Sequence, residues 1–168
     1  MLTPLQFLEV LSGCASTAAN STRNQGRRIK TSFPHYANYR GEDELIFRSL
    51  LFKELLDHGI PLEAIALEYL PPWNIDLAWC ESGICKYYVS SDKVVLVEIS
   101  PIYDEKRGGG LRKDEDESIG EDIDHVALAK GRVGVVLVPF LGRQAAPPSI
   151  PPVWRTHALT KKVHLIRC

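Results

Sequence analysis

The strongest helical pattern in the chain lies over Glu42–His58, where hydrophobic residues recur every three to four positions. They form one wide apolar face: Leu45, Ile46, Phe47, Leu50, Leu51, Phe52, Leu55 and Leu56. Acids at the start of the segment suit the positive end of a helix dipole, and Gly59 follows its end. Glu44 and Arg48 have the i,i+4 spacing of a helical ion pair. We therefore predict a helix here that packs by one face.

Short apolar runs, several of them β-branched, predict strands in the rest of the chain. These are Ala64–Tyr69, Ile75–Cys80, Lys86–Val89, Val94–Ser100, Val133–Phe140 and Val163–Ile166. The run Val94–Ser100 is almost continuously β-branched, which is typical of a central strand buried on both faces. A second helix is predicted over Ile119–Lys130, after a flexible loop over Tyr103–Ser118. This alternation predicts an α/β fold in which helices flank a mixed central β-sheet.

The first forty residues have a different pattern. Thr3–Gln6 is typical of a helix start, and Gly13 predicts an early end to that helix. The small, polar and basic stretch Ala15–Lys30 predicts a linker. We therefore expect an N-terminal helix and basic linker over residues 1–40, and an α/β domain with a proline-rich C-terminal extension over 41–168.

Composition and charge narrow the classes of protein. Hydrophobic residues make up 45% of the 168 residues and charged residues 24%, which is ordinary for a globular protein with one core. Twenty Lys and Arg against twenty-one Asp and Glu give a net charge of −1. Nucleic-acid binding would therefore need a local basic patch. No apolar run approaches the roughly 20 residues of a membrane helix, so we expect no membrane partner.

The N-terminus and the cysteines bear on the compartment. The first residues lack the basic segment and uninterrupted apolar stretch of a secretory signal, so we expect an intracellular, cytoplasmic protein. In that compartment we expect Cys14, Cys80, Cys85 and Cys168 to be reduced. The pair Cys80 and Cys85 has no second pair to complete a zinc site.

Two acids, Asp76 and Glu98, interrupt otherwise apolar strands. Burying an ionised carboxylate is costly unless it is paired or binds a metal. If both acids meet at one sheet edge, they suit a hard cation such as Mg²⁺ or Mn²⁺, which can activate water and stabilise a phosphate transition state. The alternatives are that each acid faces solvent at a strand end or pairs with an arginine, in an α/β domain without a metal site.

The residues around these acids form a longer pattern. An acid-bearing helix with Glu44 is followed by a strand with Asp76, a strand reading Glu98-Ile99-Ser100, and a helix-to-strand step near Lys130–Val138. Over about Gly41–Leu141 this order resembles the PD-(D/E)XK nuclease superfamily, and most of all the nuclease domain at the start of type I restriction motor subunits. The resemblance implies a restriction-endonuclease-like core and a metal-dependent nuclease that cuts DNA or RNA.

The resemblance also implies roles for single residues. Asp76 and Glu98 would be catalytic metal ligands, the carbonyl of Ile99 a further ligand, and Glu44 an assisting acid acting through water. Ser100 stands where the family has a lysine, and a hydroxyl cannot supply that positive charge. Lys86, Lys93 and Lys106 are near in sequence, and Lys86 is included in our predicted catalytic set with Ser100. The alternative is an inactive nuclease-fold protein that binds nucleic acid or another protein.

Basic residues of the linker and of the glycine-rich loop are the candidates for phosphate contacts. They are Arg27, Arg28, Lys106, Arg107, Arg112 and Lys113. The acids of Asp114–Glu117 oppose this interpretation, and solvated segments are the alternative. Trp73 and Trp79 flank Asp76 and are expected to pack rather than to stack on bases. The expected partner is therefore DNA or RNA, and a protein partner or a homodimer stays open.

Overall fold

The computed structural model of the chain describes residues 2–32, 40–69, 74–85, 93–105, 109–127 and 132–168. The helices are α1 (Pro4–Ser32), α2 (Arg40–Asp57), α3 (Lys113–Ala127) and α4 (Pro152–Lys161), with a short 3₁₀ turn at Leu62–Ala64. The strands are β1 (Ile65–Tyr69), β2 (Ile75–Cys80), β3 (Val94–Ile99), β4 (Val133–Val138) and β5 (Val163–Arg167). The predicted strand Lys86–Val89 lies outside the described residues.

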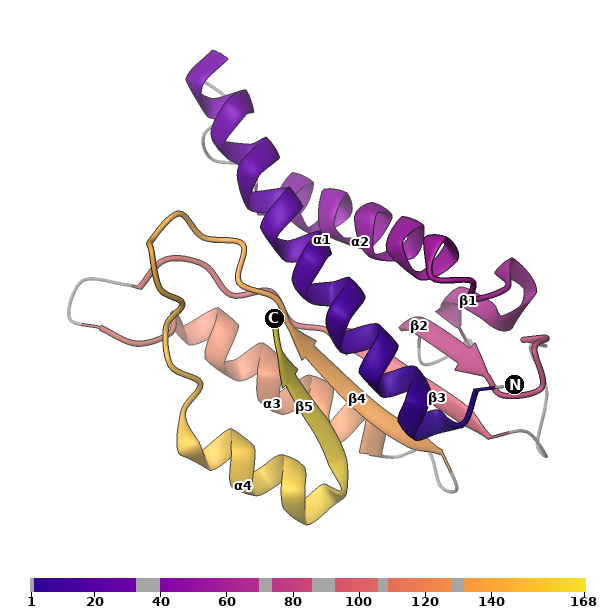
Figure 1. Cartoon of the computed structure of the whole chain (residues 1–168). Coiled ribbons are helices and arrows are strands. Elements are labelled where there is room, and N and C mark those ends of the chain that lie inside the picture. Colours follow the sequence, from indigo (N-terminus) through magenta and orange to yellow (C-terminus); the bar gives the residue numbers. More distant parts are fainter. Residues whose placement is uncertain (1, 33–39, 70–73, 86–92, 106–108, 128–131) are drawn as a thin grey trace.

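The strands form one open, mixed sheet in the order β1-β2-β3-β4-β5 (Figure 1). The first three strands pair antiparallel, and β3, β4 and β5 pair parallel. Helices α3 and α4 precede β4 and β5 and provide the crossovers that parallel neighbours need. The predicted α/β fold with a mixed central sheet is therefore confirmed, and so is the burial of β3 along its whole length.

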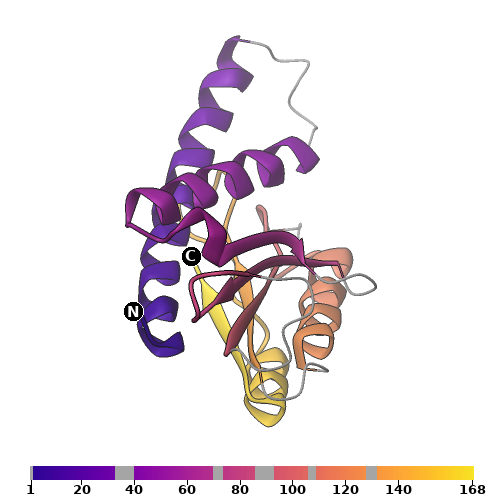
Figure 2. The same ribbon diagram turned by 90° about the vertical axis from the view of Figure 1, so that its right-hand side faces the viewer.

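Helices cover both faces of the sheet, as the two views in Figures 1 and 2 show. Successive side chains of β3 point to opposite faces. Val95 and Val97 pack in a core cluster with α1 and α2, whereas Val94 and Leu96 pack with α3 and α4. Glu98 comes two residues after Leu96 and therefore points to the same face of the sheet, toward α3.

The predicted linker over Ala15–Lys30 is wrong, because α1 continues as a helix to Ser32. Its buried side is made largely of small residues: Cys14, Ala15, Ala18 and Ala19 follow Phe7 and Leu11. Alanine is the best helix former but gives a weak hydrophobic signal, so the pattern looked like a polar linker. Phe7 stacks on Trp79 at 4.4 Å between ring centroids, which confirms that Trp79 packs in the core.

Two further elements differ from the prediction. Helix α3 begins at Lys113, within the predicted loop, because its first-turn acids favour the helix N-terminus and Glu115 accepts a hydrogen bond from the Arg112 N–H at 3.1 Å. Helix α4 begins in the proline-rich extension, where proline suits the first helical turn. Trp154 of α4 donates its indole N–H to Asp116 of α3 at 2.6 Å, which joins the two helices.

The cysteines also differ from the prediction. Cys80 and Cys85 form a disulfide, whereas Cys14 and Cys168 are free thiols. The two disulfide cysteines lie at the end of β2 and in the turn that follows it, which brings them close enough to bond. Across the described helices, none combines the length and the apolar character needed to cross a membrane.

Candidate functional site

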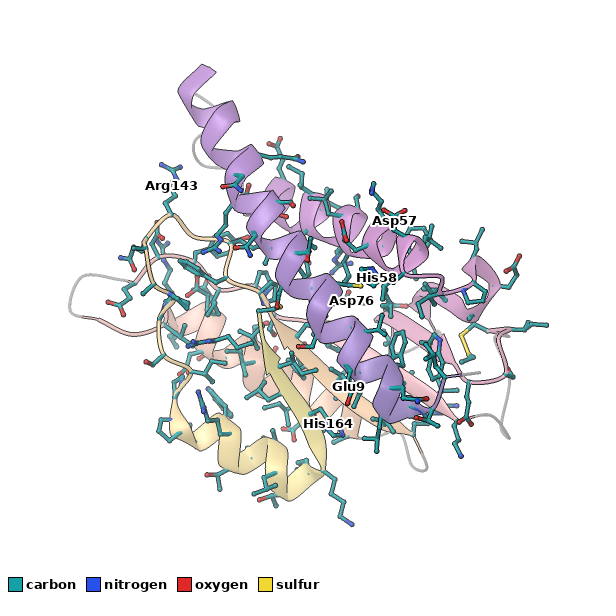
Figure 3. All side chains as sticks on the ribbon, viewed as in Figure 1. Glu9, Asp57, His58, Asp76, Arg143 and His164 are labelled. Atoms are coloured by element: carbon teal, nitrogen blue, oxygen red, sulfur yellow. A yellow bond between two sulfur atoms is a disulfide. The ribbon has the colours of Figure 1, made fainter. Side chains whose placement is uncertain are left out.

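Asp76 and Glu98 lie together at one end of two adjacent strands. In the antiparallel register Leu77 of β2 is opposite Val97 of β3, so the next residues outward are Asp76 and Glu98. Both side chains line one pocket of about 410 Å³ at the end of the sheet. Its other lining residues come from α2, α3 and the segment after β3: Glu44, Arg48, Ile99, Pro101, Tyr103, Asp114, Glu115, Ser118 and Asp122. Figure 3 shows the side chains around the labelled Asp76.

The pocket is strongly acidic, and this shifts the titration of its buried groups. Burial, and then the charge and hydrogen bonding of Asp76 and the charge of Asp122, raise the pKa of Glu98 to about 9. Burial is also the main cause that raises the pKa of Asp122, against a hydrogen bond from Ser100 that lowers it. At neutral pH the pocket therefore keeps a proton on Glu98 unless additional positive charge is present.

Arg48 provides positive charge at the α2 side of the pocket. One of its guanidinium nitrogens, Nη2, lies 2.7 Å from Asp76 Oδ1 and 2.6 Å from Glu44 Oε1. The second carboxylate oxygen of Asp76 accepts a hydrogen bond from the Ile99 N–H at 2.9 Å. The ion pair expected between Glu44 and Arg48 is confirmed, and Arg48 extends it to the buried end of β2.

Ser100 is buried and turned toward α3. Its hydroxyl donates a hydrogen bond to Asp122 Oδ2 and lies 3.3 Å from the hydroxyl of Ser118. Glu98 Oε1 lies 2.6 Å from Nδ1 of His125, which like Ser118 and Asp122 belongs to α3. Helix α3 thus supplies partners to both Ser100 and Glu98.

Of the three lysines considered as substitutes, the structure describes Lys93 alone. Lys93 lies at the other end of β3 and pairs with Glu81 at 3.5 Å. Lys86 and Lys106 lie outside the described residues. Within the described lining of the pocket, Arg48 is the only arginine or lysine.

The structure brings together Glu44, Asp76, Glu98 and Ile99, as expected, and adds partners that sequence reasoning missed. Ser118, Asp122 and His125 of α3 are spaced by four and three residues, so they share one side of the helix. That stripe was a usable signal. The predicted helix Ile119–Lys130 contains Asp122 and His125, but Ser118 falls in the predicted loop, so the stripe is incomplete in the prediction.

Of the six predicted nucleic-acid contacts, Arg112 and Lys113 have described side chains, and neither lines the pocket. Arg112 and Lys113 are exposed near the start of α3, and Lys113 pairs with Glu117 at 3.5 Å. Arg27 and Arg28 belong to the last part of α1, and their side chains lie outside the described part. Lys106 and Arg107 also lie outside it. Their contacts with phosphate stay predictions.

The metal-ligating potential of the pocket depends on few side chains. In the part of the chain that the structure describes, no three His, Cys, Asp or Glu side chains are arranged to hold a metal. Asp76 and Glu98 are the acids that line the pocket from adjacent strands, and each oxygen of Asp76 already has one partner. A cation that binds Asp76 Oδ1 would therefore lie beside the Arg48 guanidinium.

Comparison of the chain with family models, with curated proteins and with solved structures found no match. The chemistry of the pocket and the order of the elements that build it both point to the same small group of residues at the ends of β2 and β3.

Proposed function

We propose that the protein is a metal-dependent nuclease with a restriction-endonuclease-like core, or a domain derived from one, that hydrolyses phosphodiester bonds in DNA or RNA. The observation that carries the proposal is the pairing of Asp76 and Glu98 across adjacent strands in one pocket. The order of α2, three antiparallel strands, α3 and the parallel strand β4 supports it, since this is the element order that the resemblance implies.

The acids of the pocket offer oxygens of the kind that Mg²⁺ or Mn²⁺ prefers. Asp76 and Glu98 would hold the ion, with the Ile99 carbonyl as a further ligand and Glu44 acting through water. Hard cations prefer such oxygens, and Mg²⁺ keeps several of its waters, so a small set of protein ligands suffices. Glu98 also supports the fit, because its ionisation is held back by burial and by neighbouring acids, both of which a cation would offset. When bound, the ion would supply an activated water and charge stabilisation at the phosphate.

The residues of the chain then have distinct tasks in the hydrolysis. A water oxygen bonds to phosphorus, the bond from phosphorus to the leaving oxygen breaks, and the proton from water ends on the leaving oxygen. Asp76 is oriented for this by the Ile99 N–H, and Glu98 by its contact with His125. Ser100, which donates to Asp122, keeps α3 in contact with the end of β3.

A second candidate function is an inactive nuclease-fold module that binds nucleic acid, another protein or a second copy of the chain. Ser100 in the lysine position favours this alternative, and so does the ion pair by which Arg48 neutralises Asp76. Such a module would bind its partner without cutting it and without needing a divalent ion.

The test is cleavage of labelled single- and double-stranded DNA and RNA with Mg²⁺, with Mn²⁺ or with EDTA. We expect cleavage only with a divalent ion, and a loss of at least about 100-fold in Asp76→Asn and Glu98→Gln. Asp57→Asn is the matched control, because Asp57 (labelled in Figure 3) is an exposed acid of α2. It pairs with Lys53.

The outcomes separate the two functions. Cleavage that persists in EDTA, or in both site variants, would contradict the proposed site. Tight binding of a nucleic acid by the wild type, with no cleavage under any ion, would favour the inactive module.

A further inference from the structure

The positive charge that Ser100 cannot provide has a source on a different element. Arg48 reaches the pocket from α2, and its guanidinium contacts Glu44 of the same helix at 2.6 Å and Asp76 of β2 at 2.7 Å. Its side chain is 30% exposed, so part of the group faces solvent at the pocket. A cation is therefore present beside the carboxylates, although the strand position that would carry a lysine holds a hydroxyl.

We propose that Arg48 is an internal cation of the site, which holds Asp76 in the metal-free protein and binds the substrate phosphate once a divalent ion takes its place at Asp76. The inference rests on the proposed nuclease function and assigns to this chain the group that replaces the lysine.

The contacts of Asp76 favour such an exchange. Its Oδ2 accepts a hydrogen bond from the Ile99 N–H and its Oδ1 contacts Arg48, so a metal ion that binds Oδ1 lies next to the guanidinium. Two positive groups at one oxygen repel each other, which disfavours simultaneous binding. The ion and Arg48 therefore compete for one carboxylate.

The released guanidinium would stay at the pocket. Glu44 is one helical turn before Arg48 on the same helix, and it contacts Nη2, the nitrogen that also contacts Asp76. Glu44 can therefore keep that nitrogen when a metal ion takes Asp76. A guanidinium presents several N–H donors in a plane that matches two phosphate oxygens. Anchored by Glu44, Arg48 can turn toward a phosphate and stabilise the negative charge that builds during hydrolysis.

This role predicts two effects of opposite direction when the charge is removed. Metal binding should improve, because a competing cation is lost, whereas cleavage should weaken, because the phosphate loses its positive partner. A merely structural arginine would weaken both or change neither. The combination is therefore diagnostic.

The experiment uses the full chain and Mn²⁺ as the probe. Mn²⁺ affinity is measured by isothermal titration calorimetry, and kcat and KM for a labelled oligonucleotide are measured at saturating Mn²⁺. The variants are Arg48→Gln and Arg48→Lys. The matched control is Lys53→Gln, which removes one positive charge from the exposed side of the same helix.

We expect Arg48→Gln to bind Mn²⁺ about five-fold more tightly than the wild type and to cleave about 100-fold more slowly. Arg48→Lys keeps a positive charge and should cleave at least about ten times faster than Arg48→Gln. Lys53→Gln should leave both quantities within about two-fold, because exposed charges are screened. Circular dichroism checks that each variant is folded.

Binding of Mn²⁺ by the wild type without tighter binding in folded Arg48→Gln would overturn this inference alone. If Arg48→Gln does not fold, a folded Arg48→Lys protein that has lost cleavage would overturn it. Absence of Mn²⁺ binding in the wild type and in every variant would instead overturn the proposed metal site.

Discussion

Among single residues, Glu98 is a buried acid of the pocket whose ionisation is unfavourable. Its side chain is 7% exposed and lies against a sheet end that also holds Asp76. Burial and neighbouring acids raise its pKa from 4.5 to about 9. Between these two values the folded protein keeps a proton that the unfolded chain releases, so a rise in pH favours unfolding.

Because a rise in pH favours unfolding through Glu98, the pH dependence of stability provides a prediction. The free energy of unfolding of the wild type should fall as pH rises from 6 to 8.5, by up to about 1.4 kcal/mol per pH unit from this group. Glu98→Gln carries no titrating proton, so its unfolding free energy should fall less steeply. Urea unfolding of both proteins at several pH values measures the difference, and parallel curves would contradict a raised pKa for Glu98.

The sequence predicted part of the candidate site for a physical reason. An acid within an apolar strand is unusual enough to be noticed, so Asp76 and Glu98 were found from the chain alone. Arg48 was recognised only as the helical partner of Glu44, because its contact with Asp76 spans 28 positions along the chain and depends on the packing of α2 against the sheet. Nothing local in sequence encodes that contact.

At the level of elements, two glycines within helices have different surroundings. Gly13 lies within α1, where an added Cβ would meet nothing within 4 Å. Gly120 lies within α3, where an added Cβ would come within 2.5 Å of the Trp154 ring. That ring is held by its hydrogen bond to Asp116, so it cannot easily move away.

The same substitution should therefore have opposite effects on stability at the two positions. Gly13→Ala should raise the free energy of unfolding by about 0.5–1 kcal/mol, because alanine is the better helix former. Gly120→Ala gains the same propensity but overpacks against Trp154, and should lower it by about 1–3 kcal/mol. Thermal or urea unfolding of both variants is the measurement. A stabilised Gly120→Ala protein would mean that α3 and α4 are not packed as described.

The helices were harder to predict than the strands, and the reason is visible in these elements. β2 was predicted with its observed bounds, because its apolar run is short and Asp76 alone interrupts it. α1 hides its buried side in alanines, and α3 begins with a charged turn that resembles a loop. Both helices are recognisable from their packing against the sheet, which the local sequence pattern does not contain.

For the whole molecule, the two ends of β2 have separate tasks. Asp76 lies at one end, in the acidic pocket, and Cys80 ends the strand at the other. Four residues of extended chain place them about 13 Å apart. The Cys80–Cys85 disulfide closes a short loop at the end remote from the pocket. Stability contributed there should therefore be independent of the chemistry at Asp76.

The disulfide provides the last prediction. Closing so short a loop restricts the unfolded chain, so reduction should lower the free energy of unfolding by about 2 kcal/mol. Mn²⁺ affinity should stay unchanged, because Asp76 and Glu98 keep their partners when that bond is opened. Urea unfolding and Mn²⁺ titration with and without reductant measure both quantities, and a Cys80→Ala/Cys85→Ala variant controls for effects of reductant on Cys14 and Cys168. If reductant lowers the Mn²⁺ affinity of the wild type but not that of the Cys80→Ala/Cys85→Ala variant, the two ends of the sheet are coupled.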